Sequence, residues 1–289
     1  MIRCIASDMD GTLINSRQTI SEANREAILK AQQEGIQVVI ATGRSYEEAR
    51  YVLQEAGIHT PIICVNGAEV RDQNGTVVHV HSLDKKDAQE VMNILKEIDI
   101  YFELYTNKGT FTENYEIGLQ TVIDIFTTTN PPMPEEFVRQ MAKERLEKGF
   151  IREIGSYSDI MSDNEIHIYK FLVFSADKEK LQLAHQRLQP ISSIAISSSG
   201  SENLEITDQK AQKGVALKKF VEQQGIALEE TMAIGDNYND VSMFNIVGYP
   251  VAMGNALDDI KKQCRYETVT NDEDGVAKAI EMALQKVGK

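Results

Sequence analysis

The stretch that decides the fold is Ile2–Thr12, IRCIASDMDGT, in which a short apolar run ends in two aspartates and a glycine turn. The run Ile2–Ser7 predicts a buried strand. Side chains alternate along a strand with a period of two, so Asp8 and Asp10 leave it in the same direction. In an open α/β sheet they would face the carboxyl edge, where ligands bind. Two carboxylates there repel each other unless a cation or a shared proton offsets their charge, which predicts a Mg²⁺ site or a nucleophile with an acid/base partner.

The same residue types also occur in ordinary turns, because Asp, Gly and Thr favour turn conformations. An EF-hand calcium loop is excluded, since its glycine would fall at Leu13 and its bidentate glutamate at Thr19. The rest of the chain therefore decides whether this stretch is a reactive site.

The first third of the chain alternates between strand and helix patterns, which implies a parallel sheet built from βαβ units. After these units, a hairpin with the two-residue turn Asn74-Gly75 is predicted to join strands at 68–71 and 77–80. The βαβ elements that we expect are strands at 2–7, 37–41 and 61–65, a helix from the cap Ser21 to Gln33, and a helix from the capping-box pair Ser45 and Glu48 to Gly57.

The pattern becomes mixed between positions 84 and 203, and parallel α/β character returns afterwards with a helix at 213–223 and a strand at 231–234. Polar surface loops are expected at 127–134 and 197–201. The predicted fold class is therefore α/β, with a Rossmann-like parallel-sheet core formed by residues 1–83 and 204–289. Residues 84–203 are predicted to form an inserted α+β domain.

The composition excludes several classes of function. With 30 basic and 44 acidic residues among 289, the formal net charge is −14, which argues against nucleic acid or an anionic membrane surface as a partner. Three separate cysteines without a Cys-x-x-Cys pair predict neither a disulfide framework nor a zinc site. No apolar run approaches the roughly 18 residues of a membrane span, and no signal-peptide pattern precedes the first strand. We expect a cytoplasmic protein with no membrane association and no obligate protein partner.

Four polar motifs occupy equivalent positions in the predicted fold, each at the end of a core strand or at the start of the helix after it. In a parallel sheet such ends converge on one edge, so the motifs can surround one ligand. Their hydroxyl, amide, lysine and glycine N–H groups indicate an anionic ligand, and Asp236 is expected on a metal ion together with Asp8. The motifs are Asp8–Thr12, Ala41–Arg44, Lys213–Gly214 and Gly235–Asp240.

Some of these motifs can also be explained by local structure without any ligand. Thr42-Gly43 alone is also a common strand-to-helix turn, and a single helix lysine such as Lys213 is usually solvated. The last motif is harder to explain in this way, because a helix start needs one cap and this loop supplies three polar side chains: Asp236, Asn239 and Asp240.

Together the motifs resemble those of the haloacid dehalogenase-like hydrolase superfamily, and within it the Cof-like phosphatases with a type IIB α+β cap. All four stand in the family's order, and the insertion between the second and third has the size of a cap. The run Val251–Ala256, VAMGNA, is similar to the segment that follows the family's fourth motif. The resemblance implies a phosphoric monoester hydrolase whose inserted domain determines substrate specificity.

The resemblance also implies a role for each matching residue. Asp8 would be the nucleophile that forms an aspartyl-phosphate, and Asp10 the general acid/base in both half-reactions. Mg²⁺ would be bound by Asp8, the Asp10 main-chain carbonyl and Asp236, and Asp240 would orient these ligands. Phosphate would be held by the Met9 main chain, Thr42, Gly43, Lys213 and Asn239, with Arg44 and Asn66 as weaker candidates for substrate contacts.

Other functions remain open at this point. A phosphomutase or phosphotransferase would pass the phosphoryl group from the same aspartate to another hydroxyl. A signalling module would use the phosphorylated aspartate as a switch, although a base at Asp10 would shorten its signal. Neither a Cys-x5-Arg phosphatase loop nor a Walker motif is present in the sequence.

The substrate is expected to be a small phosphorylated metabolite. The resemblance leaves sugar phosphates, pyridoxal phosphate, and flavin mononucleotide with its precursors as candidates. One predicted strand carries possible contacts at His167, Tyr169 and Lys170. The simpler interpretation is that these residues alternate between the core and the surface of the inserted domain.

Overall fold

The computed structural model describes residues 1–128 and 133–287, and its chain divides into two compact units. Unit 1 consists of Met1–Val80 and Lys210–Lys289, and unit 2 consists of His81–Gln209. Unit 2 begins slightly before the predicted insertion at 84 and ends beyond its predicted end at 203. The later end has a physical reason, because the segment Asn203–Asp208 is a strand that pairs within the sheet of unit 2.

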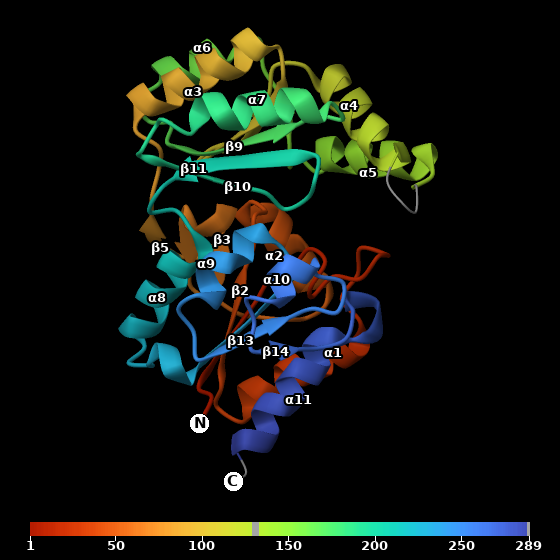
Figure 1. Ribbon diagram of the computed structural model, residues 1–289, viewed down its shortest axis with the longest axis vertical. Coiled ribbons are helices and arrows are strands. Elements are labelled where there is room, and N and C mark those ends of the chain that lie inside the picture. Colours follow the sequence, from red (N-terminus) through yellow and green to blue (C-terminus); the bar gives the residue numbers. More distant parts are fainter. Residues whose placement is uncertain (129–132, 288–289) are drawn as a thin grey trace. The chain divides into compact units, whose positions relative to one another are not determined.

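Unit 1 is built on an eight-stranded sheet (Figure 1). In its middle, β1 (Cys4–Ser7) runs parallel to β12 (Thr231–Gly235) on one side and to β2 (Gln37–Ala41) on the other. The carboxyl ends of these three strands therefore meet at one edge. The outer strands are β13 (Tyr249–Ala252) and β14 (Tyr266–Glu267) beyond β12, and β3 (Ile62–Cys64), β4 (Glu69–Arg71) and β5 (Val77–Val80) beyond β2.

Helices cover both faces of this sheet, with α8 packed on α9 and α1 packed on α11 (Figure 1). On the α8 face, Leu217 and Phe220 join Ala6 and Val39 of the strands in one apolar cluster. The capping box predicted at the start of α2 is present in the structure. The helices of unit 1 are α1 (Glu22–Gln33), α2 (Tyr46–Glu55), α8 (Lys213–Gln223), α9 (Val241–Phe244), α10 (Asp258–Lys261) and α11 (Gly275–Val287).

The predicted two-residue turn at Asn74-Gly75 is wrong. β4 and β5 are antiparallel, but Arg71 pairs with Val77, so residues 72–76 all belong to the connection. The Asp72 side chain explains the longer loop, because its carboxylate accepts 2.9 Å hydrogen bonds from the N–H groups of Asn74 and Thr76. An aspartate that binds the backbone two residues ahead is a common turn device.

Unit 2 is an α+β unit built on a six-stranded, mainly antiparallel sheet, in which β9 (Ile168–Phe174) pairs with β6 (Tyr101–Thr106) and β11 (Asn203–Asp208). One face packs against α3 (Lys85–Ile98) and α7 (Lys178–Leu188) through residues such as Phe102 and Phe171. The remaining elements are β7 (Gly109–Thr112), β8 (Arg152–Glu153), β10 (Ile194–Ser197), α4 (Tyr115–Thr128), α5 (Glu135–Glu147) and α6 (Tyr157–Ser162).

Several short elements of unit 2 were not predicted, namely β7, β8, α6 and β11. The predicted loop at 127–134 overlaps the end of α4, and its positions 129–132 lie outside the described residues. The predicted loop at 197–201 follows β10, as expected. Across residues 1–128 and 133–287, no helix combines the length and the apolar character that crossing a membrane requires.

Candidate active site

The four motifs lie on neighbouring elements of unit 1. Asp8 directly follows β1, Thr42 follows β2 and Asp236 follows β12, so three adjacent parallel strands deliver them to the same edge of the sheet. Lys213 is the first residue of α8. The topology thus brings together residues that are up to 228 positions apart, as expected from the convergence of parallel strand ends.

Lys213 holds two carboxylates together in the interior. Its Nζ lies 2.6 Å from Asp8 Oδ1 and 2.7 Å from Asp240 Oδ1, and the Lys213 and Asp240 side chains are both 0% exposed. Burial alone would lower the pKa of this lysine, but the charges of Asp240 and Asp8 outweigh burial and raise the pKa of Lys213 above its usual value. Lys213 is therefore a permanent cation in the site.

Asp240 uses its other oxygen to hold the loop after β12. Its Oδ2 accepts hydrogen bonds from the N–H groups of Asp236 at 3.0 Å and Asn237 at 3.1 Å. Both carboxylate oxygens are thus bound to donors, one to Lys213 and one to the backbone. This arrangement suits a residue that positions the loop and the lysine.

Asp236 faces the loop that follows β1. Thr12 Oγ1 donates a 2.7 Å hydrogen bond to Asp236 Oδ1. Gly11, at φ +74°, comes so close that a Cβ on it would lie 2.6 Å from Asp236 Oδ2. This position therefore requires glycine, both for the left-handed backbone and for the close approach.

Two residues of the site were not assigned from the sequence. Thr12 binds Asp236, and Asn255 Nδ2 donates a 2.8 Å hydrogen bond to the carbonyl of Gly11. Both residues stand inside motifs that the sequence had singled out, the first motif and the run Val251–Ala256. A polar side chain inside such a motif is the sequence signal that could have assigned each residue to the site.

The carboxylates of the site carry more negative charge than Lys213 can offset. Oxygens of Asp8, Asp236 and Asp240 lie within 4.8 Å of one another. Burial raises the pKa of Asp8 well above its usual range; Lys213 opposes this effect, and the neighbouring carboxylates add to it. Burial, followed by the charge of Asp240, raises the pKa of Asp236 to about 7. The three carboxylates and one lysine therefore favour the arrival of a further cation.

This donor set fits a hard divalent cation. Carboxylate and carbonyl oxygens are the preferred ligands of such ions, and the three clustered groups are all carboxylates. Asp240 belongs to the cluster but is already bound on both oxygens, whereas Asp8 and Asp236 stand at the ends of adjacent strands. The side chain of Asp10 is not part of the cluster.

Asp10 instead forms a two-pronged ion pair with Arg44. Arg44 Nε lies 2.9 Å from Asp10 Oδ2 and its Nη2 lies 2.6 Å from Asp10 Oδ1. The same Nη2 also reaches Gln18 Oε1 at 3.2 Å. Because the Asp10 side chain is 47% exposed, this pair lies at the solvent side of the site. Arg44 was expected only as a weak candidate for substrate contact, and its position against Asp10 was not predicted.

A strained turn connects two further candidates. Val65, Asn66 and Gly67 have φ of +47°, +56° and +99°, and such angles are rare for a β-branched residue like Val65. The turn brings Asn66 Oδ1 to 3.5 Å from Asn239 Nδ2, and both residues are buried. The Asn66 N–H donates to the carbonyl of Thr42, which ties the turn to the end of β2.

The remaining predicted phosphate ligands are Met9 and Gly43. Met9 is fully buried, with 0% of the whole residue exposed. Gly43 lies between Thr42, whose hydroxyl accepts a 3.1 Å hydrogen bond from the Arg44 N–H, and Arg44 itself. The roles assigned to Met9 and Gly43 stay predictions.

Comparison with known proteins gives consistent results. A family model described as haloacid dehalogenase-like hydrolase matches residues 5–280. Phosphatase YwpJ of Bacillus subtilis is 37% identical over 96% of this chain and 98% of its own length. The 5-amino-6-(5-phospho-D-ribitylamino)uracil phosphatase YwtE of the same organism is 35% identical over 98% of each chain. Pyridoxal phosphate phosphatase YbhA of Escherichia coli is 28% identical over 96% and 97%.

Solved structures agree with this assignment. A haloacid dehalogenase-like hydrolase from B. subtilis has a TM-score of 0.89 and 36% identity, covering 97% of this chain and 99% of its own. A second, from Bacteroides thetaiotaomicron, has a TM-score of 0.76 and 30% identity, covering 98% and 99%. The predicted α/β fold class and the resemblance inferred from the motifs are confirmed.

Proposed function

We propose that this chain, which belongs to the haloacid dehalogenase-like hydrolases and is a phosphatase, hydrolyses a small phosphorylated metabolite through an aspartyl-phosphate on Asp8. Two relatives are named for small substrates of this kind, a ribitylaminouracil phosphate and pyridoxal phosphate. The observation that carries the proposal is the buried group of Asp8, Lys213 and Asp240 next to Asp236. It combines a nucleophile, a fixed cation and metal-binding carboxylates at one sheet edge.

Mg²⁺ is the cation that we propose for this group, held by the carboxylates of Asp8 and Asp236 and the main-chain carbonyl of Asp10. When bound, such an ion neutralises carboxylate charge and polarises a phosphate oxygen. Lys213 supplies a second positive charge 2.6 Å from Asp8. This charge favours the ionised, nucleophilic form of Asp8.

The reaction would proceed in two displacements at phosphorus. The Asp8 carboxylate attacks, the bond to the substrate alcohol breaks, and Asp10 gives a proton to the leaving oxygen. Water then attacks the phosphorus of the acyl-phosphate, Asp10 takes a proton from it, and Asp8 is restored. The Asp10 carboxylate is held in place for both steps by its ion pair with Arg44, whose Nη2 lies 2.6 Å from Asp10 Oδ1.

The other phosphate oxygens would meet donors that are fixed in the fold. Lys213, the Thr42 hydroxyl, the Gly43 N–H and the Asn239 amide are proposed for this role. Thr42 and Asn239 are both buried, so little of their side-chain freedom remains to be lost on binding. Preorganised donors of this kind stabilise the charge of a loose phosphoryl-transfer transition state.

We also propose that unit 2 selects the substrate. Every residue assigned to the chemistry lies in unit 1, so unit 2 is free to recognise the leaving group without contributing to the reaction. Function in such a fold resides in particular sites, and specificity can therefore change while the chemistry stays the same.

The proposal is tested by phosphate release from p-nitrophenyl phosphate and from a panel of phosphorylated metabolites, each with Mg²⁺ and with EDTA. We expect Mg²⁺-dependent hydrolysis of the aryl phosphate and a higher kcat/KM for one or more small metabolites. A folded phosphoprotein should be a poor substrate. A purified protein that releases no phosphate from any of these esters in Mg²⁺ would contradict the proposed function.

A further inference from the structure

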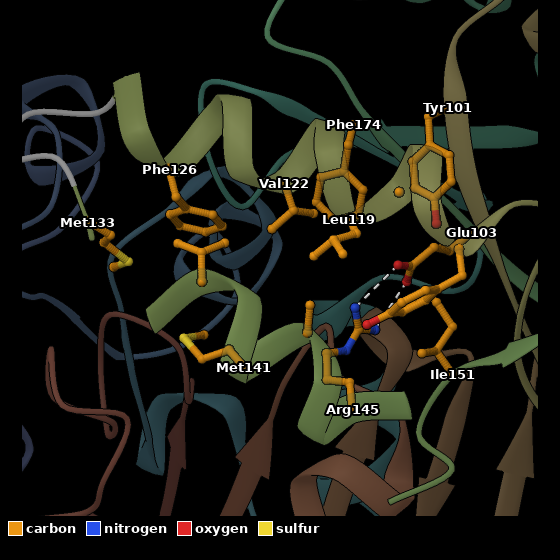
Figure 2. Close-up of a pocket in the computed structure, with 14 residues that line it drawn as sticks. Tyr101, Glu103, Leu119, Val122, Phe126, Met133, Met141, Arg145, Ile151 and Phe174 are labelled. Carbon is orange, nitrogen blue, oxygen red and sulfur yellow. Dashed lines mark hydrogen bonds and ion pairs between the residues drawn. The ribbon is translucent and has the colours of Figure 1, made fainter. Parts of the chain in front are cut away.

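Unit 2 contains a cavity of about 190 Å³ that the proposed chemistry does not use. It lies between α4, α5 and the sheet face opposite to α3 and α7 (Figure 2). All the residues that line it belong to unit 2, so the cavity is a property of this unit alone. The inference drawn from it does not depend on the phosphatase mechanism.

The walls of the cavity are apolar and partly open to water. α5 contributes a stripe at helical spacing that includes Val138 and Ala142, α4 contributes Leu119 and Val122, and the sheet contributes Phe174. Of these residues, Leu119, Val122, Ala142 and Phe174 are only partly buried. Protein interiors normally fill such space to the density of organic crystals. A ligand that covers these walls would therefore gain hydrophobic free energy.

One end of the cavity carries an ion pair. In Figure 2, Glu103 and Arg145 lie at the same end as Tyr101, while Phe126 and Met141 lie at the other. The Glu103 carboxylate accepts hydrogen bonds from Arg145 Nη1 at 3.2 Å and Nη2 at 3.1 Å, and its side chain is 3% exposed. The pair is neutral as a whole, which disfavours a charged ligand.

Glu103 has capacity for a further donor. An ionised carboxylate offers about four acceptor positions, and the two bonds from Arg145 use only part of this number. The nearby Tyr101 hydroxyl does not fill the rest, because it is hydrogen-bonded to Thr112 Oγ1 at 3.0 Å. A ligand N–H or O–H at this end would meet an acceptor that is held in place.

Size sets the remaining constraint. An engineered apolar cavity of about 150 Å³ is known to bind benzene, so a cavity of about 190 Å³ has room for one ring or a small fused bicycle. We infer that this cavity is a binding site for a small, neutral, apolar ring compound with one hydrogen-bond donor. The ring would lie between α4 and α5, and the donor would bind the Glu103 carboxylate.

Indole is a suitable probe, because it is a flat bicycle with a single N–H. We would titrate the full-length protein with indole and follow the methyl NMR signals of Leu119, Val122 and Ile151, which line the cavity. Indene has nearly the same shape but no N–H. Because a hydrogen bond to a charged acceptor is among the stronger ones, we expect indole to bind about tenfold more tightly than indene.

Two variants of α5 give a matched comparison. Ala142→Phe places a ring inside the cavity, whereas Gln140→Phe places the same ring on the exposed side of the helix. Saturable shifts should persist in Gln140→Phe and disappear in Ala142→Phe. Leu119→Trp fills the cavity from α4 and serves if Ala142→Phe does not fold, with hydrolysis of the aryl phosphate and far-UV circular dichroism as checks of folding.

Three results would overturn the inference. The first is the absence of saturable shifts at the lining methyl groups of the parent protein. The second is equal indole affinity in the parent and in a well-folded variant with a filled cavity. The third is equal affinity for indole and indene, which would remove Glu103 as the recognition group.

Discussion

Lys213 is the cation on which the buried carboxylates of unit 1 depend. Replacing it by methionine leaves Asp8 and Asp240 without their common partner, and breaking a buried ion pair in this way usually costs about 3–5 kcal/mol. We therefore expect Lys213→Met to lower the free energy of unfolding by that amount in urea titrations with EDTA. Lys218→Met, at a lysine of the same helix that is 56% exposed, is the control. Equal losses in the two variants would contradict the role of Lys213.

Asp236 is the residue whose removal should affect the metal most specifically. Asp236→Ala deletes one carboxylate from the proposed Mg²⁺ site and also the acceptor of Thr12. Mutation of a residue that only hydrogen-bonds to a metal ligand typically lowers the metal affinity about 10- to 100-fold. Because Asp236 is itself a proposed ligand, we expect the Mg²⁺ concentration for half-maximal hydrolysis to rise at least about tenfold. Asp258→Ala is the control, because it removes the same charge from an exposed position and should leave the half-maximal Mg²⁺ concentration unchanged. An Asp236→Ala variant that titrates with Mg²⁺ like the parent would refute the metal assignment.

Most of the residues that meet at the sheet edge could be predicted, because a parallel sheet forces its strand ends together. Asp8, Asp236, Asp240 and Lys213 are examples. The pairing of Arg44 with Asp10 could not be predicted, since a long side chain on a turn reaches several partners and only the folded backbone selects one.

Among the connecting elements, the turn Val65–Gly67 packs closely against the start of α8, and a substitution at Gly67 can test this contact. Gly67, at φ +99°, faces the start of α8 so closely that a Cβ would lie 2.7 Å from the Gln212 carbonyl oxygen. Gly35 also has positive φ, +78°, but has no neighbouring atom within 4 Å of such a Cβ. We expect Gly67→Ala to reduce the free energy of unfolding by about 1–3 kcal/mol more than Gly35→Ala, because overpacking adds to backbone strain. Similar losses in chemical denaturation would show that the close approach is not under strain.

Long, regular elements were predictable and short ones were not. The first two helices follow from their caps and apolar spacing, and both caps are present in the structure. β8 and β14 have two residues each, too few to show any alternation. The loop 72–76 is longer than the predicted two-residue turn because the side-chain hydrogen bonds of Asp72 compete with the backbone preference of Asn-Gly.

At the scale of the whole molecule, the proposed division of labour between the units can be tested by replacing residues 81–209 with a short flexible linker. If unit 1 contains all of the chemistry, the shortened protein should keep Mg²⁺-dependent hydrolysis of p-nitrophenyl phosphate. Its ratio of kcat/KM between good and poor metabolite substrates should fall about tenfold or more, because the selecting contacts are lost. A well-folded shortened protein that ranks substrates as the parent does would show that unit 2 does not select them.

The break in the βαβ order predicts an insertion at residues 84–203, and the compact unit 2 of the structure extends over His81–Gln209. A strand such as Asn203–Asp208 belongs to whichever sheet it pairs with, and that pairing depends on contacts with β9 and β10 that local pattern does not contain. The substrate cannot be predicted from local pattern either, because its recognition depends on side chains whose arrangement is set by the whole fold.

The central claim is that Asp8 becomes phosphorylated during turnover, and chemical trapping tests it most directly. The protein would be mixed with substrate and Mg²⁺, quenched in acid and treated with borohydride, which reduces an aspartyl-phosphate to homoserine. The tryptic peptide of residues 4–17 carries both Asp8 and Asp10, and mass spectrometry can locate the change within it. We predict homoserine at position 8 in the parent protein, and neither homoserine nor turnover in Asp8→Asn. Sustained phosphate release by Asp8→Asn, or efficient turnover by the parent without any trapped residue at position 8, would contradict the account.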